Sequence, residues 1–129
     1  MDLYNILNIS NNDIESSIKK SIEETTSDLN GLIDEGTCKI YSSYLYKHLR
    51  NKHIVSKIID TKKDLSLDYQ HWFVEVPVNE DSNYVIDLTY SQFGHDDLFS
   101  KMYNEGYQLL SSDMYEKYLS NISLTTKKK

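Results

Sequence analysis

Two strand-like runs constrain the fold most strongly: HWFVEVPV at residues 71–78 and NYVIDLTY at residues 83–90. β-Branched and aromatic residues dominate both runs, and turn-forming residues, VNEDSN, join them. We therefore expect an antiparallel hairpin. Because successive side chains of a strand point to opposite faces, an even register places His71 and Asp87 on a common face, directly opposed or on a diagonal. An odd register separates them.

Helical periodicity precedes this hairpin. Residues 12–34 carry Ile14, Ile18 and Ile22 at four-residue spacing with charged residues between them, which predicts an amphipathic helix that Asn12 or Asp13 caps.

A second helix is expected from about residue 37 to residue 50. Thr37, which follows Gly36, is its possible N-cap, and Cys38 then lies in the first turn. Six residues share one stripe of this helix: Cys38, Tyr41, Ser42, Leu45, His48 and Leu49.

The remaining segments complete an α+β order. Residues 53–60 are β-branched and predict a short strand, residues 61–68 are polar and predict a loop, and helical spacing returns over residues 96–120 with a break at 111–113. We expect one domain over residues 1–129, with a helix that starts at the cysteine packed on a small antiparallel sheet.

Charge and hydropathy exclude several classes of protein. Lys and Arg number 14 against 20 Asp and Glu, a net charge of −6, which argues against a nucleic-acid or anionic-membrane surface. No apolar run approaches the roughly 18 residues needed to span a bilayer, and the first ten residues do not resemble a signal peptide. We expect a cytoplasmic protein, or one exported without a cleaved signal. Small size and acidity fit an effector, a toxin domain or a phage-type protein.

Cys38 is the single cysteine, which rules out an intrachain disulfide and a zinc site built on several thiolates. A lone cysteine is most often a small buried apolar residue. Here, however, it occupies the start of a helix whose far end is basic, and the dipole of such a helix lowers the pKa of a thiol.

His71 and Asp87 give this thiol two suitable partners. A thiolate attacks an acyl carbon, an imidazole carries the proton, and a carboxylate fixes the tautomer and orientation of the imidazole. An aspartate inside the apolar run VIDLTY needs a partner, because an unpaired buried carboxylate is costly. His71 supplies one, and the three residues therefore form a candidate Cys-His-Asp triad.

The ordered set GTC before a helix, HWFVEV and VIDLT resembles the transglutaminase-like and papain-like cysteine protease superfamily, over about residues 30 to 95. The resemblance implies Cys38 as nucleophile, His71 as general base and acid, and Asp87 as orienting residue, with no cofactor. It implies acyl transfer on amide bonds of a protein or peptide: a cysteine peptidase, a glutamine deamidase or a transglutaminase-like enzyme.

The chain departs from the papain pattern at the oxyanion hole. Residues 30–36, NGLIDEG, contain no glutamine ahead of the cysteine. The hole then needs the Cys38 backbone N–H and one further donor, for which Gln70 and Trp72 are candidates.

Two alternatives to the triad stay open: a metal site and a binding protein. His95 could form a metal site with His71 and Asp87, which would leave Cys38 idle. His48 lies too far along the helix to reach the thiol. His53 begins the strand expected over residues 53–60 and is either a ligand or, as we favour, a surface residue. The chain could also be a binding or interaction protein that retains the scaffold without turnover.

Overall fold

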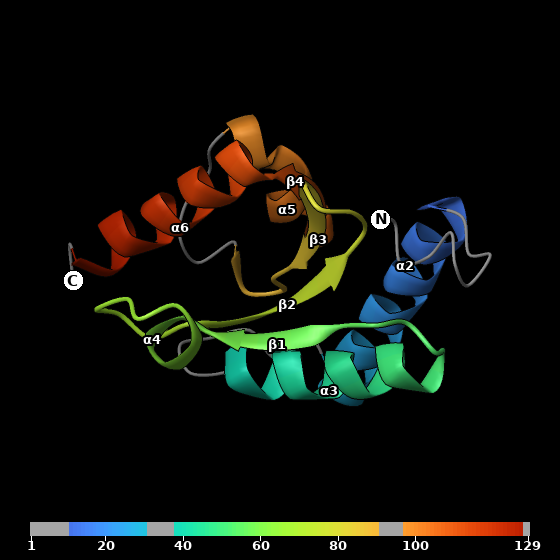
Figure 1. Ribbon diagram of the computed structural model, residues 1–129. Coiled ribbons are helices and arrows are strands. Elements are labelled where there is room, and N and C mark those ends of the chain that lie inside the picture. Colours follow the sequence, from blue (N-terminus) through green and yellow to red (C-terminus); the bar gives the residue numbers. More distant parts are fainter. Residues whose placement is uncertain (1–10, 31–37, 91–96, 128–129) are drawn as a thin grey trace.

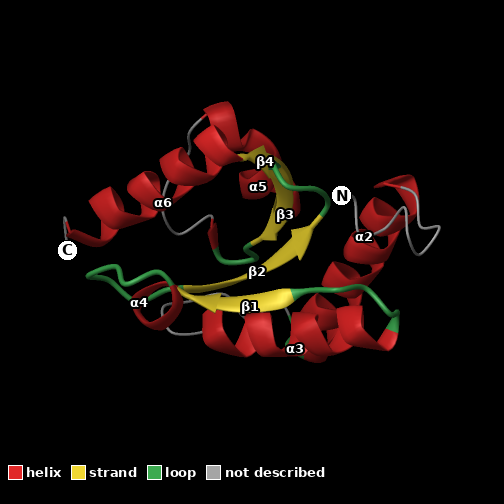
Figure 2. Ribbon diagram, viewed as in Figure 1, coloured by secondary structure: helices red, strands yellow, loops and turns green. Residues whose placement is uncertain are grey.

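The computed structural model describes residues 11–30, 38–90 and 97–127, and this part of the chain is α+β (Figures 1 and 2). Four strands form an antiparallel sheet in the order β1-β2-β3-β4. The strands are β1 (Lys57–Asp60), β2 (Trp72–Pro77), β3 (Ser82–Ile86) and β4 (Tyr107–Ser111). The helices are α2 (Asn11–Asp28), α3 (Cys38–Asn51), the short α4 (Thr61–Asp64), α5 (Ser100–Glu105) and α6 (Ser112–Lys127), with a 3₁₀ turn η2 (Asp97–Phe99).

Helices cover both faces of the sheet. Figure 1 shows α2 and α3 on one side of it and α6 on the other. Neighbouring residues of β2 divide between the two cores: Val74 packs with the isoleucines and leucines of α2 and α3, and Phe73 packs with the aromatic residues of η2 and α6. Both side chains are fully buried. The hairpin is therefore the central layer, as a run of strand residues buried on both faces requires.

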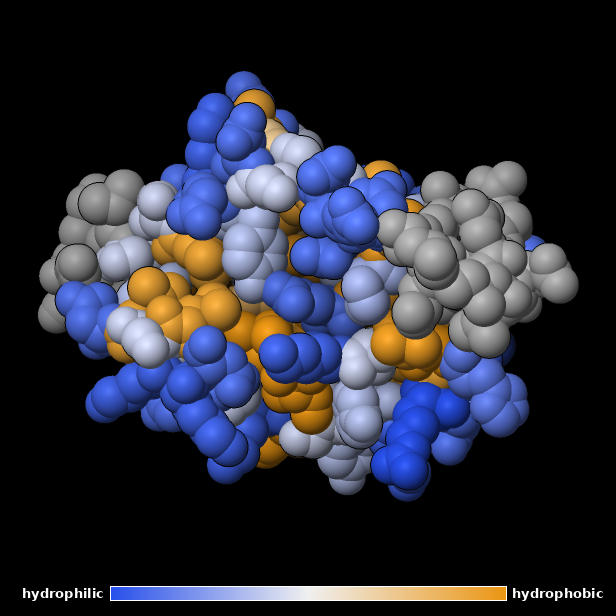
Figure 3. Space-filling model, viewed as in Figure 1, coloured by the Kyte–Doolittle hydropathy of each residue, from blue (hydrophilic) through white to orange (hydrophobic). Residues whose placement is uncertain are grey.

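The outer surface follows the same layering. In the space-filling view, hydrophilic side chains cover the outer helices, and apolar side chains reach the surface mainly in the band between them (Figure 3). None of the described helices is both long and apolar enough to cross a membrane.

The expected helix at Cys38 is confirmed. α3 begins at that residue, and its buried stripe consists of Cys38, Tyr41, Ser42, Leu45 and Leu49. His48 is only half-buried and bonds to Asp28 of α2 at 2.7 Å. The expected cap at Thr37 lies outside the described residues.

The first helix differs from the expectation at both ends. α2 already includes Asn12 and Asp13, so neither of them is its cap. It ends at Asp28, followed by Asn30 in the left-handed region with φ of 55°. Because few residues other than glycine and asparagine adopt this conformation, Asn30 ends the helix well before residue 34.

Two further expectations from the sequence were wrong. The strand expected over residues 53–60 begins only at Lys57, because His53 (φ 60°) and the Ile54 N–H, which donates to the Leu49 carbonyl, close the end of α3. The polar stretch expected as a loop contains α4, whose N-terminus is capped by the Asp60 carboxylate through the backbone N–H groups of Lys62 and Lys63.

β4 is the strand that the sequence did not predict. It lies inside the region where helical spacing was expected, between α5 and α6, and it pairs with β3 from Tyr107 opposite Ile86 to Ser111 opposite Ser82. Gly106 makes the turn into this strand with φ of 86°, a conformation that favours glycine.

Candidate active site

Cys38 lies at the N-terminus of α3, where that helix packs across β1 and β2. The side chain is 7% exposed. Burial raises the pKa of the Cys38 thiol, but a hydrogen bond and charge from the His71 imidazole and a hydrogen bond from the Trp72 backbone N–H lower it, and the net shift is downward. The sulfur is thus placed to ionise more easily than a free thiol.

The backbone of His71 is clamped immediately before β2. Its N–H donates to Thr61 Oγ1 at 2.9 Å, and its carbonyl accepts the Thr61 N–H at 3.0 Å. The Thr61 hydroxyl donates in turn to the Tyr69 carbonyl at 2.7 Å, and the Thr61 side chain is fully buried. The first residue of α4 therefore fixes the position from which the imidazole extends.

The His71 ring bonds directly to Asp87. Nε2 of His71 lies 2.7 Å from Oδ2 of Asp87, and these side chains are only 3% and 1% exposed. Because Asp87 takes Nε2, Nδ1 is the ring nitrogen left for the Cys38 sulfur. Burial lowers the pKa of His71, but the charge and hydrogen bond of Asp87 and then the contact with Cys38 raise it to about 10. The ring is therefore an imidazolium at neutral pH.

Asp87 is surrounded by donors on both carboxylate oxygens. The Thr89 N–H and hydroxyl donate to Oδ1 at 3.2 and 3.1 Å, while His71 and the Tyr118 hydroxyl, at 2.6 Å, both reach Oδ2. Burial raises the pKa of Asp87, but the charge and hydrogen bond of His71 and the bonds from Tyr118 and Thr89 lower it below its ordinary value. The carboxylate thus stays ionised although it is buried.

The register of the hairpin is even, and of the two registers considered from the sequence this is the one that puts His71 and Asp87 on the same face. Val74 pairs with Ile86, and continuing this register places Thr89 opposite His71 and Asp87 on the diagonal of the same face. Neither site residue lies inside a strand, however: His71 precedes β2 and Asp87 follows β3. The bonds from Thr89 to the Asp87 carboxylate form a local turn that ends β3, which is why the run VIDLTY is not a strand throughout.

The two oxyanion-hole candidates occupy different positions. The exposed Gln70 amide donates to Asp60 Oδ2 at 3.1 Å, whereas the Trp72 backbone N–H points to the Cys38 sulfur. The Trp72 ring is half-buried, with Lys39 Nζ 5.6 Å from its centroid. Both candidates line a surface hollow of about 460 Å³ with Lys39, Ile58, Asp60, Lys63 and Asp64.

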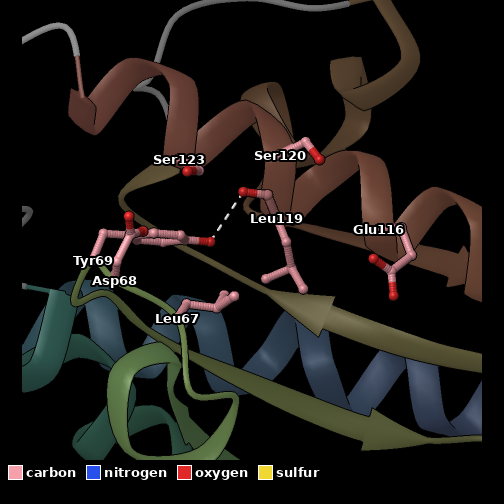
Figure 4. A pocket seen from close by; sticks show the side chains of 7 residues that line it. All are labelled: Leu67, Asp68, Tyr69, Glu116, Leu119, Ser120 and Ser123. Carbon is pink, nitrogen blue, oxygen red and sulfur yellow. Dashed lines mark hydrogen bonds between the residues drawn. The ribbon is translucent and has the colours of Figure 1, made fainter.

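A second hollow of about 480 Å³ lies between the segment before β2 and the side of α6 that faces this segment (Figure 4). It is lined by Leu67, Asp68, Tyr69, Glu116, Leu119, Ser120 and Ser123. The Tyr69 hydroxyl crosses it to donate to the Leu119 carbonyl at 3.0 Å, which ties this segment to α6.

The described residues include no group of three or more His, Cys, Asp and Glu side chains able to hold a metal ion. In the metal alternative, His71 and Asp87 would need His95, which lies outside the described residues. The two instead bond to each other, so this arrangement is suited to proton transfer.

Sequence reasoning missed three residues that contact the triad: Thr61, Thr89 and Tyr118. The spacing of Asp87 and Thr89, two residues apart, is a usable signal, since an aspartate often accepts from the backbone two residues on. Thr61 and Tyr118 carry no such local signal, because one sits in a polar segment and the other in a helical stripe.

Comparison with protein families, with curated proteins and with solved structures gives no match for this chain. The roles proposed below therefore depend on the contacts of Cys38, His71 and Asp87 themselves.

Proposed function

We propose that this chain is an enzyme of thiol-dependent acyl transfer, with Cys38 as nucleophile, His71 as proton carrier and Asp87 as orienting residue. One observation carries the proposal: thiol, imidazole and carboxylate form a single chain of contacts, although they come from three separate segments. The finer interpretation of the fold, a papain-like or transglutaminase-like core, belongs to the same proposal.

The reaction begins with the Cys38 thiolate and the His71 imidazolium. The sulfur attacks the carbonyl carbon of an amide, forming the S–C bond and a tetrahedral oxyanion. His71 then gives its proton to the leaving nitrogen as the C–N bond breaks, which leaves a thioester on Cys38. Water or an amine attacks the thioester, His71 accepts its proton, and the S–C bond breaks to regenerate the thiolate.

Backbone N–H groups near the sulfur are candidates for stabilising the oxyanion. Cys38 lies in the first turn of α3, where N–H groups have no partner within the helix. The Trp72 N–H faces the sulfur and stabilises the negative charge of the thiolate. As the S–C bond forms, this negative charge moves from the sulfur to the carbonyl oxygen, which the same N–H is near enough to stabilise. Gln70, held by Asp60, lines the adjoining hollow and is the second candidate.

The substrate class is the amide of a protein or peptide, and peptidase, deamidase and transamidase reactions share the first step above. Three residues that line the adjoining hollow are sequence neighbours of the site residues: Lys39 follows the nucleophile, and Gln70 and Trp72 flank His71. This position fits entry of a substrate side chain past the Trp72 ring.

A binding protein without turnover is the second candidate, and burial of the sulfur favours it. Cys38 is 7% exposed, and the gap around it is closed by α3 side chains and by the segment after β3. A partner that recognises the surrounding surface needs no access to the thiol.

An activated ester separates the two functions. With p-nitrophenyl acetate, the enzyme proposal expects a burst of one equivalent of nitrophenolate at neutral pH and acetylation of Cys38 by mass spectrometry. Cys38→Ser and His71→Ala should each abolish the burst. His48→Ala is the control and should retain the burst, because His48 lies on α3 with Cys38 but bonds to Asp28. Absence of acetylation in the folded wild-type chain would overturn the enzyme proposal and favour binding.

A further inference from the structure

Tyr118 connects the C-terminal helix to the candidate triad. Its hydroxyl donates to Asp87 Oδ2 at 2.6 Å, and this same oxygen bonds to His71 Nε2 at 2.7 Å. Cys38 comes from α3 on one face of the sheet and Tyr118 from α6 on the other (Figure 1). The cluster therefore depends on helices from both outer layers.

The Tyr118 ring is held firmly in place. It is fully buried and contacts four aromatic rings, with centroids 5.2 to 6.4 Å away: Phe73, Tyr90, Phe99 and Tyr115. Edge-on packing against Phe73, at 88° between the planes, fixes the direction of the hydroxyl. Burial and then the charge of Asp87 raise the pKa of the phenol, so it remains a donor at all moderate pH values.

We propose that Tyr118 is a positioning residue that holds the Asp87 carboxylate and, through it, the His71 imidazole. The catalytic meaning of this role depends on the proposed function, whereas the physical link between Tyr118 and His71 does not. Tyr118 touches no reacting atom, so its effect passes through Asp87.

The hydroxyl has two effects on the pair. It prevents rotation of the carboxylate, because Oδ2 is held by Tyr118 while Oδ1 is held by Thr89. It also places the positive end of an O–H dipole beside Oδ2, which weakens the attraction of Asp87 for the imidazolium. Removing the hydroxyl should therefore strengthen the electrostatic attraction between Asp87 and the imidazolium and raise the pKa of His71.

The test is the titration of the His71 imidazole by ¹⁵N NMR in the full-length chain with Cys38→Ser, which removes coupling to the thiolate. The chain has four histidines, and the His71→Ala variant assigns the signal. Tyr118→Phe should raise the His71 midpoint by about half a pH unit or more. An unchanged or lowered midpoint overturns the proposal.

Tyr115→Phe is the matched control. Tyr115 lies on the same helix, contacts Phe73 and bonds to a carboxylate, Glu75, that is not part of the triad. Its loss should leave the His71 midpoint unchanged. An equal shift in both variants would mean that the packing of α6, rather than the bond to Asp87, sets the midpoint, and this result would also overturn the proposal.

A second variant covers failure of Tyr118→Phe to fold. Placing 3-fluorotyrosine at position 118 by codon suppression keeps the ring and makes the hydroxyl a stronger donor. The midpoint of His71 should then move in the opposite direction, downward, and a lack of movement overturns the proposal. Because this readout requires no turnover, it is independent of the p-nitrophenyl acetate burst: each of the two proposals can fail without the other.

Discussion

His71 Nε2 and Asp87 Oδ2 lie 2.7 Å apart at one end of the β2–β3 hairpin, and water is almost completely excluded from both side chains. A buried charged pair is strongly coupled, and removing one partner leaves the other charge uncompensated. Each change to this pair should therefore alter both the ionisation of Cys38 and the stability of the fold.

The first prediction concerns Asp87→Asn. The amide keeps the shape of the carboxylate but loses its charge, and its NH₂ group can face Nε2, which favours the wrong tautomer of His71. The pKa of His71 should fall and that of Cys38 should rise, so alkylation of Cys38 by iodoacetamide at about pH 6.5 should slow at least roughly tenfold. The second-order rate constant measures this effect.

Asp81→Asn is the control for this change. Asp81 is exposed in the turn between β2 and β3, so the same chemical substitution there should leave the rate constant unchanged. A wild-type rate in folded Asp87→Asn would show that the carboxylate has no influence on the thiol.

A second prediction follows from the opposite shifts of the pKa values of Cys38 and His71. The Cys38 pKa is lowered and the His71 pKa is raised to about 10, so the pH range in which thiolate and imidazolium coexist is widened at both ends. The alkylation rate should rise through an inflection clearly below the roughly 8.5 of a free thiol. In His71→Ala, burial without a cation should move the inflection above that value.

The comparison variant is His48→Ala, since His48 lies on α3 but bonds to Asp28. Its alkylation profile should overlay that of the wild type. A wild-type inflection at or above that of a free thiol would contradict an activated nucleophile.

Periodicity predicted the elements that burial shapes locally. The stripe from Cys38 to Leu49 repeats with the helix because one face of α3 is buried, and the hairpin was found because β-branched residues fill both cores. β4 was not predicted because it is buried on both faces of the sheet. Tyr107 lies in one core and Leu110 in the other, so its five residues lack the alternation of a half-buried strand.

Only the part of the candidate site that follows from the chemistry of its residues could be predicted from the sequence. A buried histidine and a buried aspartate need partners, which pointed to their pairing before any distance was known. Tyr118 lies 31 residues beyond Asp87, and its helical spacing indicates only that it faces the core. Which core residue directs a hydroxyl at a carboxylate depends on tertiary packing, and no local pattern records it.

The third prediction concerns Thr61→Val. Valine fills nearly the same volume, but the buried N–H of His71 then loses its acceptor and the carbonyl of Tyr69 loses its donor. The free energy of unfolding should fall by about 1–3 kcal/mol, as urea denaturation measures it. Alkylation of Cys38 should slow as well, because the backbone clamp on His71 is weakened.

Thr26→Val provides the reference for this effect. Thr26 is exposed on α2, so its substitution should change the free energy of unfolding by less than about 0.5 kcal/mol. Equal losses in the two variants would show that Thr61 contributes nothing specific to the His71 segment.

The last prediction is the pH dependence of stability, measured in the Cys38→Ser chain so that the thiol does not titrate. The His71 pKa is raised above 6.5, so its contribution to stability should be complete below about pH 6.5 and lost as the pH rises toward the raised value. The Asp87 pKa is lowered, so its contribution should be present above about pH 4 and lost on acidification. The free energy of unfolding of this chain, minus that of the same chain with His71→Gln, should therefore be largest near about pH 5.5 and decline toward pH 10. Equal differences at the two pH values would mean that folding does not raise the His71 pKa and that the imidazole is not held as the charged partner of Asp87.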